Sequence, residues 1–466
     1  MKNELIKYLF KESMRTNTNR IKQRNFYSYP ILMFVFFSIV IGAVFLINPN
    51  VDVSKIYNVG FYIFLITGIM SGAFGMYARD YLERKYGDFG NLLSNSLILP
   101  IKMKTIFFSF AFSDMLFYLL WFISPVILAY AMVLLIFGMF SYTIVTLFLS
   151  LFFVFLYGFM GAFFLSMLFE RSKVIFSLFM GGLFFGIVMF FFNGGIVNTF
   201  VYDFYVNPTF LGFFYLICLL FSLIIGCFLT IGREYRTKFS KSKKIKSIKF
   251  SNKIDFFIFK DFIDLKRTKG LFGVPFFIVF LPAILLLLMF LNLNNFLSLN
   301  IDILFFSIII SLLCVSLFNS LMSSDNVTYY KFLPVNLEDV VKSKIKVSII
   351  LSFVYSFLIL LGYAFYNNDF YLFLQSMLVF FSMLIYNFNL NFLLTGLNPN
   401  ERLLDSTVLM KYFVFLFPLV LVFIIVNSIF SSLIWVYFLI LVLMLIVSKI
   451  YFKLGIKKWR SSFLYD

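Results

Sequence analysis

Apolar runs of about 20 residues recur along almost the whole chain, separated by short polar segments. A run of that length crosses a hydrocarbon layer of ~30 Å as a helix, because each helical residue adds ~1.5 Å. The strands of a membrane barrel would instead alternate in polarity over ~10 residues. The length of the runs therefore predicts an all-α polytopic membrane protein.

The composition agrees with this fold class. Hydrophobic residues make up 62% of the 466 residues and charged residues 13%, whereas soluble domains carry about 25% charged residues. We expect about twelve transmembrane helices, at 30–47, 60–78, 110–137, 142–169, 174–193, 211–232, 271–290, 303–322, 347–366, 370–397, 411–430 and 432–449.

The distribution of basic residues predicts the orientation of these spans. With both termini in the cytoplasm, every Lys and Arg except Lys55 falls in a cytoplasmic segment. Basic residues retained on the cytoplasmic side set membrane topology. These segments are 1–29, 79–105, 171–173, 233–269, 331–346, 402–411 and 449–460. We therefore expect a multi-pass protein of the cell membrane with both termini cytoplasmic.

The net charge of +18 does not indicate a nucleic-acid partner. The basic residues stand beside the ends of predicted spans, not on a folded basic domain. Contact with the lipid bilayer and its anionic headgroups explains them better.

Three matches between distant segments indicate an internal repeat. Phe10-Lys11-Glu12 corresponds to Phe259-Lys260-Asp261, and Leu99-Pro100-Ile101 corresponds to Leu333-Pro334-Val335. The fourth spans align from Leu156 and from Ile385. We expect two six-helix halves, 1–232 and 255–466, joined by a basic cytoplasmic linker at 233–254. Because six is even, the halves are parallel repeats.

Each half also begins with a short cytoplasmic amphipathic helix. In "DFFIFKDFIDLKR" one predicted face is apolar and would lie at the membrane interface. This face holds Phe256, Phe259, Phe262 and Ile263, and the opposite face holds Lys260, Asp261, Asp264 and Arg267.

The Leu-Pro segments follow the second span of each half. Pro334 suits the first turn of a new helix, because proline lacks an amide hydrogen and has a fixed φ angle. The helix that follows has an apolar face of Val340, Val341 and Ile345 and a charged face of Glu338, Asp339, Lys342 and Lys346. An ordinary membrane-hugging loop is the alternative interpretation of these segments.

An amphipathic N-terminal helix with a Leu-Pro segment between the second and third spans resembles the permeases of the ABC-2 type exporter family. In that family a short coupling helix after the second span contacts a separate ATPase. The resemblance implies docking by Leu99, Pro100, Ile101, Lys102, Lys104, Leu333, Pro334, Val335, Glu338, Asp339 and Lys342, helped by Lys7, Lys11, Lys260 and Asp261. The second half also has Lys344, where the first half has Phe110. The segment 193–210 would correspond to re-entrant structure on the outer side.

The chain has no nucleotide-binding motif of its own. The sequence G-x-x-x-x-G-K-[ST] does not occur, so the chain cannot cradle nucleotide phosphates by a P-loop. His is absent, which removes imidazole metal sites and Ser-His catalysis. We expect a transport subunit without cofactor or metal, served by a separate P-loop ATPase in two copies.

Polar residues within the spans mark further candidate sites. Asn387, Asn391, Thr395 and Asn398 form one stripe, which fits either helix packing or a transport pathway. Asp114 is either a carboxylate at the start of a helix or a site of proton or cation coupling. Small residues at Gly68, Ser71, Gly72 and Gly75, and at Gly182 and Gly186, favour close helix approach.

Two other functions fit twelve helices. One is a secondary transporter or a lipid-linked saccharide flippase, although the charged network expected for ion coupling is missing. The other is a membrane-embedded enzyme acting on lipid-linked substrates. The absence of His and the isolation of Asp52, Asp203, Asp302 and Asp369 argue against the enzyme.

Overall fold

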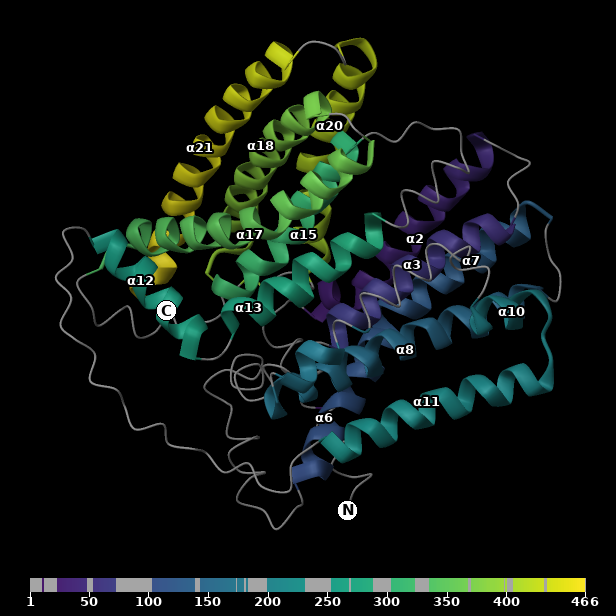
Figure 1. Ribbon diagram of the computed structural model, residues 1–466. Helices are drawn as coiled ribbons and strands as arrows, with labels where there is room; N and C mark the ends of the chain where they lie inside the picture. The colour runs from purple at the N-terminus through teal and green to yellow at the C-terminus, as the bar shows by residue number, and fades with distance from the viewer. Residues whose placement is uncertain are drawn as a thin grey trace. The chain divides into compact units, whose positions relative to one another are not determined.

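The computed structural model describes most of the predicted spans, and its described residues form helices without strands (Figure 1). The description covers residues 11, 23–47, 53–72, 103–138, 143–172, 174–179, 182, 199–230, 253–267, 270–287, 303–322, 335–367, 370–397, 399, 405–430 and 434–465.

The chain divides into two compact units. The first unit holds residues 1–16 and 27–238, and the second holds residues 17–26 and 239–466. The main division falls inside the segment predicted as a linker, 233–254. Each unit is described by itself below.

In the first unit, α8 is the central helix. It contacts α3, α10 and α11, and α3 also contacts α6. The helices are α2 (Gln23–Ile47), α3 (Val53–Gly72), α6 (Met103–Tyr118), the π-helical turn η3 (Leu119–Ile123), α7 (Ser124–Ile136), α8 (Thr143–Arg171), α10 (Phe200–Val206) and α11 (Phe210–Thr230).

Glycines bring α3 and α8 into backbone contact. A Cβ atom on Gly158 would lie 2.7 Å from the carbonyl oxygen of Leu65 and 3.3 Å from Cα of Gly68. On the facing helix, a Cβ on Gly72 would collide with the backbone of Phe159. The expected packing role of Gly68 and Gly72 is confirmed. Gly182 differs, since no described atom would approach its Cβ within 4 Å, and Gly75 and Gly186 lie outside the described residues.

In the second unit, α18 has the central place. It contacts α15, α17, α20 and α21. The helices are α12 (Lys253–Arg267), α13 (Gly270–Pro275), the π-helical turn η5 (Phe276–Phe280) continuing to 287, α15 (Ile303–Met322), α17 (Leu337–Asn367), α18 (Phe370–Thr395), α20 (Ser406–Phe430) and α21 (Ile434–Tyr465).

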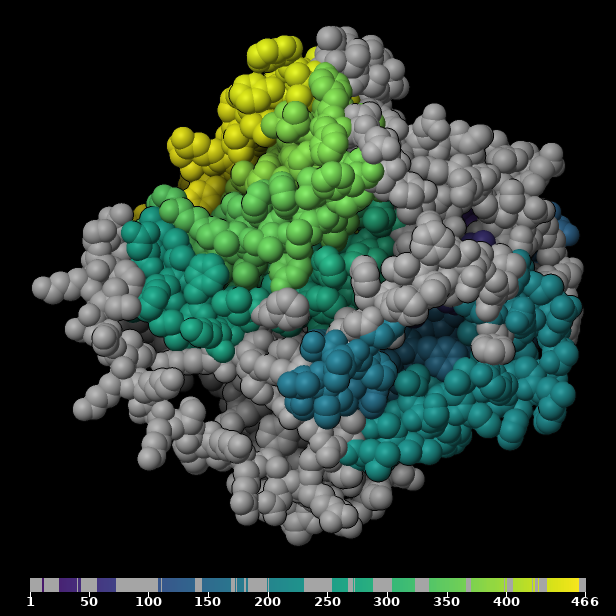
Figure 2. Space-filling view, in the orientation of Figure 1, coloured from purple at the N-terminus to yellow at the C-terminus, as the bar shows by residue number. Residues whose placement is uncertain are grey.

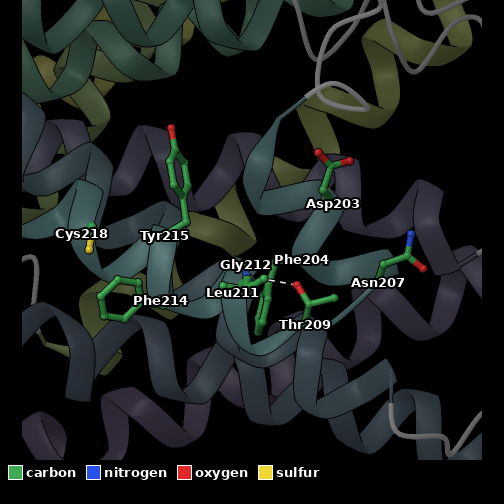
Figure 3. A pocket seen from close by; sticks show the side chains of 9 residues that line it. All are labelled: Asp203, Phe204, Asn207, Thr209, Leu211, Gly212, Phe214, Tyr215 and Cys218. Carbon is green, nitrogen blue, oxygen red and sulfur yellow. Dashed lines mark hydrogen bonds between the residues drawn. The ribbon is translucent and has the colours of Figure 1, made fainter.

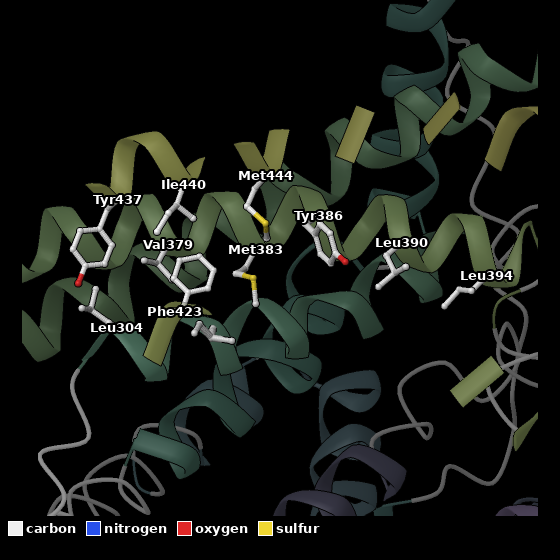
Figure 4. Packing of buried hydrophobic residues seen from close by; sticks show 11 residues of the cluster. Leu304, Val379, Met383, Tyr386, Leu390, Leu394, Phe423, Tyr437, Ile440 and Met444 are labelled. Carbon is white, nitrogen blue, oxygen red and sulfur yellow. The ribbon is translucent and has the colours of Figure 1, made fainter. Parts of the chain in front are cut away.

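One stripe of α18 forms the core of the second unit (Figure 4). Its side chains recur every three or four residues, which places them on one side of the helix. They meet Leu304 and Ile308 of α15, Phe423 of α20 and three residues of α21. The stripe is Val379, Met383, Tyr386, Leu390 and Leu394, and the residues of α21 are Tyr437, Ile440 and Met444.

Each π-helical turn ends two residues before a proline. The turn η3 ends at Ile123 before Pro125, and η5 ends at Phe280 before Pro282. Proline removes an amide donor and its ring crowds the preceding turn, so the helix changes its hydrogen-bond pattern there. Both helices continue beyond their proline, α7 as far as Ile136 and the helix after η5 as far as residue 287.

Seven helices in the described part of the chain are long and apolar enough to cross a membrane. They coincide with the predicted third, fourth, sixth, eighth, ninth, tenth and twelfth spans. Four shorter apolar helices, Asn25–Ile39, Tyr57–Gly72, Gly273–Leu287 and Ser406–Val420, coincide with the first, second, seventh and eleventh. Most of the predicted fifth span lies outside the described residues.

Candidate docking site at the start of α17

The second Leu-Pro segment leads directly into a long helix. We expected a short coupling helix followed by a separate span from 347, but α17 runs without a break from Leu337 to Asn367. The carbonyl oxygen of Asn336 accepts from the amides of Asp339 and Val340, and these bonds begin the helix. The charged first turns and the apolar remainder of α17 are therefore parts of one continuous helix.

The amphipathic helix α12 packs against this same end of α17. Its buried side chains are Phe257, Asp261 and Leu265, which are spaced four residues apart and lie on one face. Asp261 was expected on the water-facing side, so that prediction is wrong for this residue. Phe256, expected on the membrane-facing side, is 48% exposed.

A buried ion pair joins the two helices. Nζ of Lys344 in α17 donates to Oδ1 of Asp261 in α12 at 2.7 Å, and their side chains are 2% and 3% exposed. Nζ of Lys260 lies 3.8 Å from the same oxygen and 3.5 Å from Oδ2 of Asp264. Burial of a single charge would be costly, so each member of the pair requires the other. Lys344 and Asp261 therefore hold the helices together and do not belong to an outer surface.

The other charged residues of this end face outward. Glu338 and Lys342 form a pair at 2.5 Å with half-exposed side chains, and Lys346 is exposed. Nζ of Lys342 also lies 5.9 Å from the ring centre of Phe452 in α21. Asp339 and Val335 are partly buried. We call Glu338, Asp339, Lys342 and Lys346 the charged rim.

Several predicted docking residues lie outside the described residues. These are Lys7, Leu99, Pro100, Ile101, Lys102, Leu333 and Pro334. Lys104 and Phe110 fall within α6, without described side chains, and Lys11 is exposed. Of the predicted docking set, the structure thus brings together Glu338, Asp339 and Lys342 on α17 with Lys260 on α12.

The polar stripe of α18 bonds to a neighbouring helix. Nδ2 of Asn387 donates to Oγ of Ser311 at 3.2 Å, and Nδ2 of Asn391 donates to Oδ1 of Asn319, both in α15. Oγ1 of Thr395 donates to the carbonyl oxygen of Asn391. All three stripe residues are buried, and Asn398 lies outside the described residues. These contacts favour helix packing over a transport pathway.

A further amide faces the opposite neighbour and was not expected from the sequence. Nδ2 of Asn389 donates to Oγ of Ser448 in α21 at 2.5 Å. Ser448 in turn donates to the carbonyl oxygen of Ile385 at 3.1 Å. Asn389 is two residues from both Asn387 and Asn391 and therefore lies on another side of the helix. This spacing could have predicted that its side chain contacts a different helix.

Asp114 is not at a helix start. The helix α6 begins at Met103, eleven positions earlier, and Asp114 is buried with 4% exposure. The interpretation as a solvated first-turn carboxylate is therefore wrong. A carboxylate inside an apolar helix is unusual and suggests a function by default.

Comparison with protein families, with curated sequences and with solved structures finds no match for this chain. The class that its own features define is a protein whose described residues are helical and include apolar helices of membrane-spanning length. The amphipathic helix α12 packs against the N-terminal end of one of these helices, α17.

Proposed function

We propose that this chain is the membrane-spanning permease subunit of an ATP-driven exporter, coupled to a separate P-loop ATPase at the start of α17. The observation that carries the proposal is the Asp261–Lys344 pair. It fastens an amphipathic helix to the first turns of a 31-residue helix, at an end that also exposes opposite charges.

The mechanism follows from the continuity of α17. A partner that displaces the charged rim would displace the whole of α17, because the helix is unbroken from Leu337 to Asn367 and has no hinge. The buried pair makes α12 move together with the base of α17. ATP hydrolysis in the partner would then tilt or shift α17 relative to α15 and α18, which it contacts.

The packing plan of each unit supports a 6+6 organisation. In the first unit the predicted second, fourth and sixth spans pack in sequence as α3, α8 and α11. In the second unit the same spans pack as α15, α18 and α21. Gly158 and Asn387, which correspond in the aligned fourth spans, both contact the second span of their own half. Similar partners at corresponding positions are expected of repeated halves.

The test is reconstitution with an ATPase. The tagged full chain is purified from its native membranes in mild detergent, and a P-loop ATPase that co-purifies is then co-expressed with it. We expect the complex to hydrolyse ATP faster than the ATPase alone. If the purified chain retains no P-loop ATPase, the proposal fails.

Docking is tested by the exchange Glu338→Lys with Lys342→Glu. This double change keeps an oppositely charged pair at i,i+4 and so preserves the helix, but it reverses the charges shown to a partner. We expect co-purification and stimulated hydrolysis to fall, with membrane insertion unchanged. Lys411→Glu, at the start of α20, is the matched control and should retain the partner. Equal retention by both proteins would reject docking at the rim.

A secondary transporter is the alternative, and the burial of Asp114 is the observation that favours it. The discriminating measurement is substrate uptake or efflux driven by an imposed proton or sodium gradient in liposomes containing the chain alone. Gradient-driven transport abolished by Asp114→Asn would establish this alternative. Transport only with ATP and the ATPase would exclude it.

A further inference from the structure

A hollow of about 550 Å³ lies where α10 turns into α11 in the first unit (Figure 3). This is within the range of ~300–1,000 Å³ typical of small-molecule sites. Its lining residues lie in the first unit, on α10, on the turn after it and on the first turns of the predicted sixth span.

The walls of the hollow are fixed by bonds to α8. Oγ1 of Thr146 donates to the carbonyl oxygen of Tyr205 in α10 at 3.2 Å, and Oη of Tyr157 donates to the carbonyl oxygen of Leu216 in α11 at 2.6 Å. The ring of Tyr205 also stacks on Tyr57 of α3, with centroids 4.4 Å apart and planes 3° apart. These contacts hold α10 and α11, the two helices beside the hollow, against α8 and α3.

The lining has an apolar part and a polar part. Figure 3 shows Phe204, Leu211 and Phe214 around the turn into α11, whereas Asp203 and Asn207 lie on the side of α10. Among the described residues that line the hollow, Asp203 is the only one with a charge. Thr209 accepts from the amide of Gly212 at 3.0 Å and so begins α11.

The apolar part continues onto a surface suited to lipid. Only 11% of the apolar window of α11 is buried, and Figure 2 shows this teal helix at the surface. Leu211 and Phe214 are 78% and 58% exposed. The hollow lies at the end of this span, where a bilayer would place its headgroups. A ligand with one polar end and apolar chains matches both parts.

Charge complementarity defines the headgroup. A lone carboxylate attracts an ammonium group, and the amide of Asn207 can donate to a phosphate oxygen beside it. In the predicted topology the hollow lies on the outer side, where Lys55 is the one basic residue. Few cationic side chains would therefore compete with a lipid ammonium group for Asp203. We propose that the hollow between α10 and α11 binds a phospholipid with an ammonium headgroup from the surrounding layer, with Asp203 contacting the ammonium.

The experiment uses the full chain in nanodiscs of phosphatidylglycerol. One preparation contains a small fraction of phosphatidylethanolamine with a diazirine on its acyl chain, and the other contains phosphatidylglycerol with the same diazirine. Cross-links on Phe210–Cys218 are quantified by mass spectrometry and normalised to cross-links on α21, which is also largely exposed. We expect about threefold more labelling by the ethanolamine lipid than by the glycerol lipid, because a single exposed ion pair changes binding by about that factor.

Asp203→Asn should bring the two probes to equal labelling and leave the elution profile of the protein unchanged, because Asp203 is exposed. Asp255→Asn, an exposed carboxylate at the start of α12, is the matched control and should keep the preference. High salt should reduce the preference in the unaltered chain. Equal labelling of that chain by both lipids, or a preference that survives Asp203→Asn, would overturn the proposal. Since no ATPase is present, the outcome is independent of the proposed transport function.

Discussion

Lys344 and Asp261 form a buried ion pair at 2.7 Å although 83 positions separate them in the chain. Both side chains are at most 3% exposed. The pair therefore lies where water cannot screen it, and it fixes the amphipathic helix α12 on the base of α17.

Removing one member of this pair should be strongly destabilising. Asp261→Asn leaves the Lys344 charge buried without its carboxylate, and we expect it to lower the free energy of unfolding by about 3–5 kcal/mol. Lys344→Met should cost less, because Nζ of Lys260 still lies 3.8 Å from Oδ1 of Asp261. The double change Asp261→Leu with Lys344→Met should recover most of that loss. Thermal unfolding in detergent measures the effect. Asp264→Asn, whose side chain is 47% exposed, should cost less than ~1 kcal/mol, and single variants no worse than this control would contradict the prediction.

The contact between α3 and α8 predicts opposite effects for two glycines of the same helix. Gly158→Ala places a methyl group 2.7 Å from the carbonyl oxygen of Leu65, so the helices must separate, at a cost of about 1–3 kcal/mol. Gly161→Ala places a methyl group more than 4 Å from every described atom beyond its neighbours in the helix. It should be neutral or stabilising by up to ~1 kcal/mol, because alanine favours helix. Melting temperatures of the two variants give the comparison, and equal shifts would disprove close approach.

The hydrogen bond between Asn391 and Asn319 should appear as energetic coupling between α18 and α15. In a double-mutant cycle of Asn391→Ala and Asn319→Ala, we expect a coupling of about 0.6–1.7 kcal/mol, the range known for polar pairs between membrane helices. Ser316→Ala should show no coupling with Asn391→Ala, since Ser316 donates within α15 to Leu313. Zero coupling for the asparagine pair would contradict the helix-packing interpretation of the stripe and favour the transport pathway instead.

Two glycines with the same backbone angle should respond differently to alanine. Gly138 and Gly396 both have φ of +71°, which costs ~1–2 kcal/mol for a residue with a Cβ. At Gly396 the new Cβ would also lie 2.8 Å from the ring of Trp459, whereas no described atom beyond its chain neighbours would lie within 4 Å of a Cβ on Gly138. Gly396→Ala should therefore lower the unfolding temperature more than Gly138→Ala. Gly138→Asn tests the cost of the backbone angle by itself, because asparagine tolerates positive φ better than alanine does.

The sequence predicted the helices well and their polar contacts poorly. Eleven of the predicted spans coincide with apolar helices of the described chain, because a run of apolar residues must satisfy its backbone within itself wherever water is absent. The amphipathic helix of residues 253–267 was also foreseen, since its periodicity is local. The packing of Gly68 and Gly72 against another helix was predicted correctly, whereas the environment of Asp261 was not, since its side chain is buried against α17 and does not face water.

The sequence by itself determined that the described chain is helical and that many of its helices are apolar, several of them long enough to span a membrane, because hydropathy and helix length depend on consecutive residues. The tertiary structure decided which polar groups are interior. It placed Lys344 on Asp261, Asn391 on Asn319 and Gly158 on the backbone of α3. Such contacts depend on the rotation and separation of helices that are distant in the chain. Packing of side chains fixes those two quantities, and the order of residues along one helix does not reveal them.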